Sequence, residues 1–426
     1  MVLLAARDLS CVALGVCQAL PAEPRLFTLF LNEFLPMRIV DIRDGVAPIA
    51  SPIRNAFIDF STMTISVIAI VTDVIRDGAP VIGYGFHSNG RYAQQGILRS
   101  RLVPRLLQAE PDTLLDDSGQ NLDAHRVWRT FMHNEKPGGH GDRAVAAGAL
   151  DMAVWDVIAK IEEKPLWRLL SERYNNGQFD AQIMVYPGGG YYYPDKQISG
   201  LQDEMRGYDE AGYQVAKMKI GGADLDTDLA RIEGALEVLG DGQRLAVDAN
   251  GKFDLDTALA YAKAIEPLNL FWYEEVGDPL DYALQAELAG HYPGAMATGE
   301  NLFSTQDVCN LIRFGGMRAD RDWIQADPAL AYGLTEYMNL IEATEALGWP
   351  RRRLMPHGGH QLSLNIAAGL QIGGTESYPA VFQPYGGFAD DIPIVGGYTT
   401  LPDTPGIGME HKPTMLAALR KHLELA

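Results

Sequence analysis

Three acidic residues recur at equal spacing in the second half of the chain, each near the end of a short apolar run. Asp248 lies in RLAVDAN, Glu274 in LFWYEEV and Glu300 in AMATGEN, and each is 26 residues from the next. Three converging anions repel one another unless a hard cation lies between them, and carboxylate oxygens in octahedral geometry are the ligands that Mg²⁺ prefers. The spacing therefore predicts one Mg²⁺ site, whereas a single such carboxylate is more often a helix cap or an ion-pair partner.

Two lysines in VAKMKI add basic chemistry next to this site. Side chains alternate along a strand, so Lys217 and Lys219 share one face and point toward the predicted metal. An adjacent cation disfavours protonation and can bring the pKa of a lysine from ~10.4 toward ~7–8, where it acts as a base. The alternative is a solvated strand with counter-charges, and the apolar residues Val215, Met218 and Ile220 argue against it.

A histidine and an aspartate provide a second pair. His357 lies in MPHGGH, and Asp327 in WIQADPA falls one strand earlier. A neighbouring carboxylate orients an imidazole and favours its protonated form. A lone histidine is usually structural, but this one coincides with a base, a metal site and an orienting acid at matching strand ends. His360 is interpreted as a companion of the glycine turn, without a chemical role.

The elements that must position these residues follow a strand–helix alternation. Short apolar strands are expected to begin near 181, 215, 244, 270, 295, 322, 353 and 380, with helical patterns between most of them. Eight such units favour a (β/α)-barrel over an open doubly wound sheet, and in barrels the functional groups lie at the carboxyl ends of the strands. No GxGxxG follows the first strand, which disfavours a dinucleotide site.

The remainder of the chain predicts further parts. The runs ISVIAIVTDV (65–74) and PVIGYGF (80–86) indicate an antiparallel meander, and a helical pattern extends from Gly148 until Pro165. We therefore expect a disordered or peripheral extension over 1–36 and an α+β domain over 37–175. The barrel is expected over 176–388, and a C-terminal segment over 389–426 is expected to pack back on the α+β domain.

Charge and cysteine content restrict the partners. The net charge of −20, from 35 basic and 55 acidic residues, disfavours binding to nucleic acid or to anionic membranes. Cys11, Cys17 and Cys309 have no metal-binding spacing and form no even framework, which fits a reducing cytoplasm. The first 36 residues make a weak signal peptide and are too short and too charged to span a membrane.

The combination of KMK, DAN, EE, GEN, DP and HGG resembles the enolase superfamily, in its mandelate racemase-like branch, from residue 37 to the C-terminus. The resemblance implies a (β/α)7β-barrel, a modified TIM barrel, with an α+β capping domain formed by the N-terminal region and the C-terminal tail. It also implies one Mg²⁺ held by Asp248, Glu274 and Glu300. Lys219 matches the general base, His357 the general acid and Asp327 the partner of the histidine. Barrels of this branch are often assemblies, so a homo-oligomer is expected.

Further positions match residues that contact the substrate in this superfamily: Asn55, Asn89, Lys136, Tyr193, Lys217, Asn250 and Glu376. Within the run Tyr191–Tyr193 the assignment is open by one place. The loops SNGRYAQQG and NEKPGGHG resemble those of enzymes that dehydrate a short hydroxy diacid, which implies conversion of D-tartrate to oxaloacetate and water.

Three alternatives remain open from the sequence. A racemase would use the same lysine and histidine, each as a base on one face of the substrate. Other acid-sugar dehydratases differ mainly in the size of the pocket. A non-catalytic barrel would be expected to lack a metal ligand, Lys219 or His357, and none of these is missing.

Overall fold

The computed structural model describes residues 36–49, 51–193 and 197–425. The chain divides into two units, Met1–Pro36 and Met37–Ala426, and all the described helices and strands belong to the second. The extension expected over 1–36 lies outside the described residues except for Pro36, and so do Cys11 and Cys17. Cys309 is buried with a free thiol. Among the described residues, no helix combines the length and the apolar character needed to cross a membrane.

An antiparallel sheet of order β1-β2-β3 follows the start of this second unit, as the meander pattern predicts. Its strands are β1 (Ile39–Pro48), β2 (Thr64–Arg76) and β3 (Ala79–Phe86). Asp77 and Gly78 both have positive φ in the two-residue connection between β2 and β3, as a tight hairpin turn requires. Residues 65–70 of β2 are all buried, and because side chains alternate along a strand, both faces of this part of the sheet are covered.

The helix α5 (Asp142–Ile161) covers this sheet, and residues 144–159 are all buried. It begins six residues before the predicted start at Gly148, and Pro165 separates it from α6 (Leu166–Tyr174). Gly85 lets α5 approach closely, because a Cβ there would overlap the carbonyl oxygen of Ala149. On its other side α5 meets α12 (Leu334–Ala346), where Trp155 Nε1 donates to Thr335 Oγ1 at 3.1 Å. Burial on both sides explains why α5 has no polar face.

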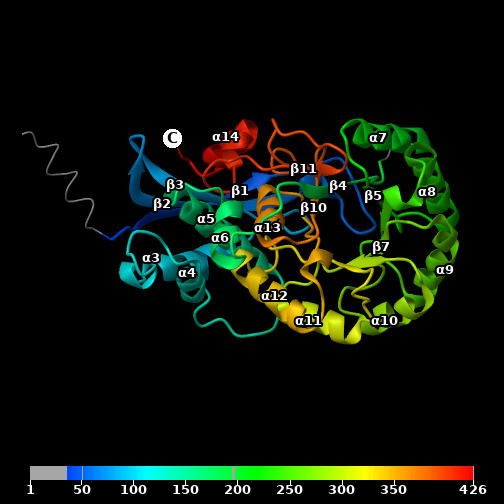
Figure 1. The fold of residues 1–426 in the computed structure, drawn as a ribbon, viewed down its shortest axis with the longest axis horizontal. Helices are drawn as coiled ribbons and strands as arrows, with labels where there is room; N and C mark the ends of the chain where they lie inside the picture. Colours follow the sequence, from blue (N-terminus) through cyan, green and yellow to red (C-terminus); the bar gives the residue numbers. More distant parts are fainter. Residues whose placement is uncertain (1–35, 50, 194–196, 426) are drawn as a thin grey trace, which may run out of the picture. The chain divides into compact units, whose positions relative to one another are not determined.

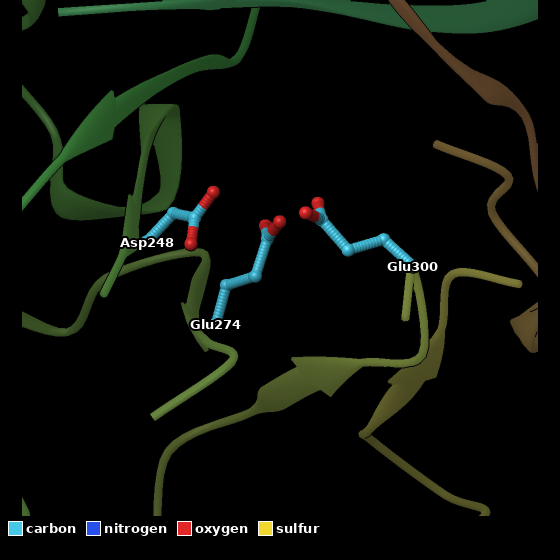
Figure 2. A group of neighbouring side chains, drawn as sticks. All are labelled: Asp248, Glu274 and Glu300. Carbon is cyan, nitrogen blue, oxygen red and sulfur yellow. The ribbon is translucent and has the colours of Figure 1, made fainter. Parts of the chain in front are cut away.

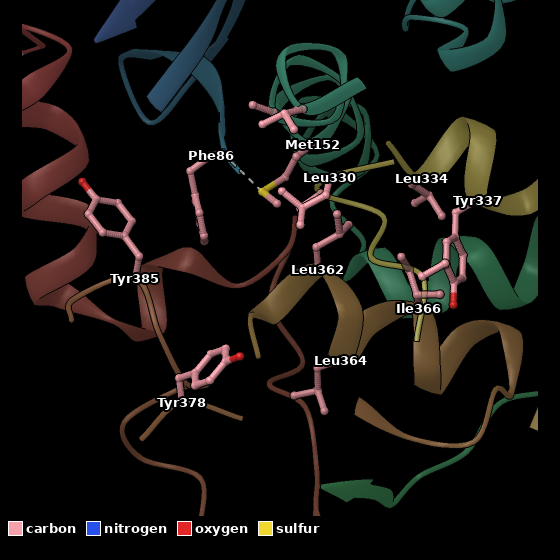
Figure 3. Close-up of a cluster of buried hydrophobic side chains, with 14 of the residues drawn as sticks. Phe86, Met152, Leu330, Leu334, Tyr337, Leu362, Leu364, Ile366, Tyr378 and Tyr385 are labelled. Carbon is pink, nitrogen blue, oxygen red and sulfur yellow. Dashed lines mark hydrogen bonds between the residues drawn. The ribbon is translucent and has the colours of Figure 1, made fainter. Parts of the chain in front are cut away.

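The smaller helices of the N-terminal region are α2 (Gln95–Ile97), α3 (Val103–Leu107) and α4 (Ala124–Phe131). A core cluster joins the sheet side to the barrel side (Figure 3). In it, Phe86 of β3 and Met152 of α5 lie close to Leu330, Leu362 and Leu364 from the barrel. The backbone N–H of Phe86 donates to Met152 Sδ at 3.4 Å. The two sheets therefore share one hydrophobic core.

A second, mainly parallel sheet has the order β10-β4-β5-β6-β7-β8-β9. Its strands are β4 (Ile183–Gly189), β5 (Ala216–Lys219), β6 (Leu245–Asp248), β7 (Trp272–Glu274), β8 (Met296–Thr298), β9 (Trp323–Ile324) and β10 (Thr375–Ser377). Residues of β5 to β8 are all buried, as expected for parallel strands covered on both faces.

Helices alternate with these strands and form an arc outside them (Figure 1). They are α7 (Ile198–Glu210), α8 (Leu225–Leu239), α9 (Leu255–Ile265), α10 (Tyr282–His291), α11 (Thr305–Phe314), α12 and α13 (Gln361–Leu370). Five of them begin at a side-chain cap that accepts from the backbone of the first turn, provided by Asp224, Asp254, Asp281, Ser304 and His360. Each cap ends a βα loop close to the strand end that it follows.

The last two predicted strands differ from the structure. The seventh, near 353, is only a bridge between Leu354 and Ile324, but its backbone joins β9 to β10. Met355 N donates to Ile324 O at 2.8 Å, and Glu376 N donates to Pro356 O at 3.1 Å. The eighth predicted strand, near 380, is wrong, because the strand is β10 and residues 380–387 form bends and turns. Pro379 and Pro384 in that segment lack the N–H that a sheet ladder requires.

The parallel sheet with its helices, beside the antiparallel sheet, is consistent with a modified TIM barrel. At the end of the chain, β11 (Tyr398–Thr399) pairs with β4 and α14 (Pro413–His422) packs on β1 and β2. Arg43 of β1 donates to the carbonyl oxygen of Glu424 at 2.5 Å. The expected domain boundaries at 175 and 388 stay predictions.

Candidate active site

Three carboxylates meet at the carboxyl ends of neighbouring strands. Asp248 and Glu274 are paired residues at the ends of β6 and β7, and Glu300 follows β8. Their ligand atoms lie within 4.8 Å of one another, and all three side chains point to a common centre (Figure 2). The structure thus contains an acidic triad positioned to bind a metal ion, as the equal spacing predicts.

The chemistry of this triad fits a divalent cation. Burial and the neighbouring Asp248 carboxylate raise the pKa of Glu274 to about 8. Glu300 Oε2 is buried and accepts no hydrogen bond from any described residue. Both observations describe negative charge without sufficient compensation, which a bound cation would stabilise.

Lys217 lies at the centre of the acidic groups. Its Nζ donates to Glu274 Oε1 at 2.6 Å and lies 2.9 Å from Glu376 Oε1 and 3.5 Å from Asp248 Oδ2. Burial lowers the pKa of this ammonium, but the Glu274 and Glu376 carboxylates outweigh burial and raise it. Lys217 is fully buried and does not line the central cavity that Lys219 reaches. In this structure it compensates carboxylates beneath the cavity, Glu376 among them. Neither residue lines the cavity, and their predicted contact with substrate stays a prediction.

Lys219, two residues further along β5, lines the cavity. Its Nζ lies 2.5 Å from Asp248 Oδ2 and 5.4 Å from the centre of the Tyr191 ring. Burial lowers the pKa of Lys219, and the cation of Lys217 also lowers it, but the Asp248 carboxylate raises it above its ordinary value. The expected lowering of the Lys219 pKa is therefore wrong when only the side chains of the protein are considered, because the charge nearest to Lys219 is negative.

His357 lines the opposite wall of the cavity. Along the sheet, its segment is separated from β5 by β10 and β4 on one side and by β6 to β9 on the other. Its Nδ1 is 3.1 Å from Asp327 Oδ2, and its Nε2 is 3.1 Å from the hydroxyl of Tyr378 and 3.7 Å from Glu300 Oε2. Burial lowers the pKa of His357, but Glu300 and Asp327 outweigh burial and raise it to about 9. His357 is thus held as a proton donor.

The neighbouring His360 has a different position. Its side chain accepts from the backbone N–H of Ser363 and caps α13, and it does not line the cavity. Its interpretation as a turn residue is consistent with this arrangement.

A cavity of about 250 Å³ lies above these groups. Its walls come from the loops that follow β1 and β3 and from the strand ends of the barrel. The residues that line it are Asn55, Phe57, Ile58, Phe60, Asn89, Gly90, Arg91, Tyr191, Lys219, Asn250, Glu275, Glu300, Asn301, His357 and Tyr378. Of the predicted substrate contacts, the structure brings Asn55, Asn89 and Asn250 together with Lys219 and His357.

Two predicted contacts lie elsewhere. Lys136 is exposed and lines a separate cavity of about 260 Å³ beside Trp128 and His140. Tyr193 lines another cavity, whereas Tyr191 lines the central one, so the assignment within this run moves by two places. The backbone turns sharply after β4, and the first tyrosine is the one whose ring covers Lys219.

Besides Tyr191, the sequence analysis missed four polar cavity residues: Arg91, Glu275, Asn301 and Tyr378. Three of them stand beside a residue or motif that it singled out. Arg91 lies two places after Asn89, Glu275 is the second glutamate of EE, and Asn301 ends GEN. Their closeness in the sequence to predicted site residues could have identified them. Tyr378 follows Glu376 by two places, so alternation along β10 could have indicated it.

Two family models match the chain. The model of the mandelate racemase / muconate lactonizing enzyme N-terminal domain matches residues 37–171. The enolase C-terminal domain-like model matches residues 200–415, which include the three carboxylates, Lys219 and His357.

Known proteins with similar sequences or structures include enzymes named for acid sugars. The 3,6-anhydro-alpha-L-galactonate cycloisomerase of Streptomyces coelicolor is 27% identical over 379 residues, 88% of this chain and 93% of that protein. The arabinonate dehydratase of Saccharolobus solfataricus is 29% identical over 279 residues, 63% of this chain and 71% of that protein. A solved structure of L-talarate dehydratase from Polaromonas sp. JS666, complexed with Mg and L-glucarate, has a TM-score of 0.69 at 26% identity and covers 87% of this chain and 94% of that one.

Proposed function

Because this chain belongs to the enolase superfamily, in its mandelate racemase and muconate lactonizing enzyme branch, we propose that it is a Mg²⁺-dependent hydro-lyase acting on a hydroxy acid. The proposal includes the (β/α)7β form of barrel expected from the sequence. The observation that carries this is the acidic triad, flanked in one cavity by Lys219 and by His357 with Asp327. The arabinonate and L-talarate dehydratases among the similar proteins support it, as does the magnesium complex of the latter.

Asp248, Glu274 and Glu300 would hold the ion, which when bound makes a proton next to a substrate carboxylate more acidic by withdrawing charge from its oxygens. Lys219 Nζ accepts that proton, and the C–H electron pair forms the new C=C bond. His357 Nε2–H gives its proton to the β-hydroxyl, which leaves as water with the electrons of the C–O bond. The enol tautomerises to a 2-oxo acid.

Lys219 must be neutral to accept a proton. Its nearest charge is the Asp248 carboxylate, which stabilises the ammonium. A divalent cation on Asp248 would offset that negative charge and, together with burial and Lys217, favour the neutral amine. The same carboxylate therefore links ion binding to the basicity of Lys219.

His357 favours elimination over racemisation. A racemase would need this imidazole neutral so that it could accept a proton, whereas Asp327, which is not one of the metal ligands, stabilises its protonated form. The hydrogen bond from Nδ1 to Asp327 leaves Nε2 to face the cavity beside Tyr378. This arrangement supports a donor that protonates a leaving hydroxyl.

D-tartrate is the proposed substrate, with oxaloacetate and water as products. Support comes from the resemblance of two loops, SNGRYAQQG and NEKPGGHG, to those of D-tartrate dehydratase, and from a cavity of about 250 Å³, which suits a small acid. A cytoplasmic homo-oligomer remains part of the same proposal.

The test is a screen of acid sugars for formation of a 2-oxo acid, with D-, L- and meso-tartrate, galactarate and arabinonate. Oxaloacetate is detected by NADH loss in the presence of malate dehydrogenase. We expect D-tartrate to be converted at least about 100-fold faster than its stereoisomers, because a site that pairs each hydroxyl discriminates strongly. Comparable rates with a six-carbon acid would contradict the substrate but not the chemistry, and no 2-oxo acid from any acid sugar would contradict the function.

A further inference from the structure

We propose that Arg91 binds a second carboxylate of the substrate, beside the loop that carries Glu300 and Asn301, and so selects dicarboxylic over monocarboxylic acids. Arg91 follows β3 and lines the cavity from the side of the N-terminal sheet. The inference rests on the proposed function, because it concerns the substrate of the same cavity.

The charge of Arg91 is not compensated by a protein carboxylate. Three side chains that line the cavity can carry a positive charge, and two of them have acidic partners, since Lys219 pairs with Asp248 and His357 with Asp327. Arg91 takes part in no ion pair with any residue in the described ranges. A guanidinium remains charged at every physiological pH, so the cavity contains a permanent cation with which no described carboxylate forms a direct ion pair.

The guanidinium is also held in a defined position. Its Nη1 donates to Gly90 O at 2.7 Å and its Nη2 to Asn301 Oδ1 at 2.5 Å, and the group lies 4.9 Å from the centre of the Phe303 ring. Asn301 is fixed in turn, because its Nδ2 donates to Glu275 Oε1 at 2.5 Å. These contacts use two of the five N–H groups of the arginine, so further donors are available for an anion.

A purely structural role explains this arrangement less well. Arg91 does connect the N-terminal sheet to the loop after β8, but its partner there is the neutral Asn301, with which the charge contributes little beyond a hydrogen bond. An acidic side chain in place of Asn301 would neutralise the arginine and exclude an anion from the cavity. A fixed cation in the same cavity as the acidic metal site can bind a second carboxylate while the first is held at the metal site.

The resemblance implies that Lys136 contacts the substrate, but Lys136 does not fit this place as well. It is exposed, lies outside the central cavity and faces Trp128 and His140 in another one. Arg91 therefore takes the role that the resemblance implied for Lys136.

The experiment compares acids of equal length that differ only at the second end: D-tartrate with threonate, and galactarate with galactonate. Binding is measured by calorimetry with Mg²⁺ on the full chain carrying Lys219→Ala, so that no ligand is consumed. Arg91→Gln should weaken binding of the dicarboxylates by about 10- to 100-fold, the value of a hydrogen bond to a charged group, and change binding of the monocarboxylates by less than about 3-fold. Binding of the dicarboxylates to Arg91→Lys should be intermediate between that of the parent protein and that of Arg91→Gln. Lysine keeps the positive charge but lacks the paired N–H donors of the guanidinium.

The matched control is Arg129→Gln, the same substitution at an exposed arginine of α4 that lines a different cavity. It should leave both classes of ligand unchanged. Equal weakening of dicarboxylates and monocarboxylates by Arg91→Gln would overturn the proposal, as would loss of dicarboxylate binding in Lys136→Gln but not in Arg91→Gln. No measurable dicarboxylate binding to the parent protein would also overturn it.

Failure of the proposed function gives a different result. If no acid sugar is dehydrated but the dicarboxylate preference exists and disappears with Arg91→Gln, the dehydratase proposal fails and the role of Arg91 stands. If the parent enzyme dehydrates diacids and monoacids equally well, the role of Arg91 fails and the dehydratase proposal stands.

Discussion

Lys219 Nζ lies 2.5 Å from Asp248 Oδ2, so the residue expected to accept a proton is paired with a carboxylate expected to bind a cation. The two residues are direct partners in the register of β5 and β6, and both are buried. Ion binding and proton abstraction therefore share one carboxylate, and removing either function should affect the other.

Removal of the metal should abolish turnover. Exhaustive chelation is expected to stop formation of the 2-oxo acid, and added Mg²⁺ should restore it. Without the ion, the carboxylates of Glu274 and Asp248 pair only with Lys217 and Lys219 and keep these lysines protonated. Asp248→Asn should lower kcat/KM by more than about 100-fold through loss of an ionic ligand. Full activity in metal-free protein, verified by elemental analysis, would exclude a role for the ion.

Lys219 and His357 should have separable roles. In heavy water, His357→Asn should still exchange the α-hydrogen of the substrate while losing dehydration by about 10²- to 10⁴-fold, because Lys219 removes the proton without a donor for the hydroxyl. Lys219→Ala should lose both exchange and dehydration. Exchange is followed by proton NMR. Retained exchange in Lys219→Ala together with lost exchange in His357→Asn would reverse the two roles.

Asp327→Asn should lower the alkaline limit of activity. Asp327 is one of the groups that raise the pKa of His357 to about 9, so the donor form is present below that pH and is lost above it. Without the carboxylate the pKa falls, and we expect the alkaline limb of the kcat profile to move down by roughly one pH unit. A lower rate with an unchanged pH profile would indicate that Asp327 only orients the ring.

The metal ligands could be predicted from the sequence because strand ends in a repeated βα unit meet at one rim. Spacing alone therefore placed Asp248, Glu274 and Glu300 together, and the period of two along a strand placed Lys219 beside them. These rules concern regular backbone, and they succeeded where the backbone is regular.

Loops follow no such period. The resemblance assigned Lys136 and Tyr193 to the cavity, but turns direct them elsewhere, and Arg91 enters it instead. The basicity of Lys219 was also misjudged from sequence, because the covalent order shows the nearby Lys217 but not the distance to Asp248 across the strands.

Gly85→Ala should destabilise the protein. A Cβ at Gly85 would overlap the carbonyl oxygen of Ala149 in α5, and the buried sheet and helix cannot separate without losing packing. We expect a loss of about 1–3 kcal/mol in the free energy of unfolding, measured by urea titration. Gly96→Ala is the control, because Gly96 lies in α2 with no atom within 4 Å of an added Cβ. Equal stability of the two variants would contradict the close approach.

A buried histidine near the site should control stability in mild acid. His87 Nε2 accepts from the backbone N–H of Ser66 at 2.9 Å, and Nδ1 donates to Ser88 O at 2.8 Å. If Nε2 carried a proton, it would point at the N–H of Ser66, which is also a donor, and would have no acceptor there. Burial lowers the pKa of His87 from 6.5 to about 4, so the folded protein keeps this imidazole neutral.

The sign of the effect follows from proton binding. Between about pH 6.5 and pH 4 the unfolded chain binds a proton at His87 that the folded protein does not, so the free energy of unfolding falls as the pH falls, by about 3 kcal/mol over that range. His87→Gln should flatten this part of the profile, whereas His291→Gln, at an exposed histidine of α10, should leave it unchanged. Urea titrations at half-unit steps of pH measure both slopes. Identical slopes for the parent protein and His87→Gln would show that His87 is not the group that titrates.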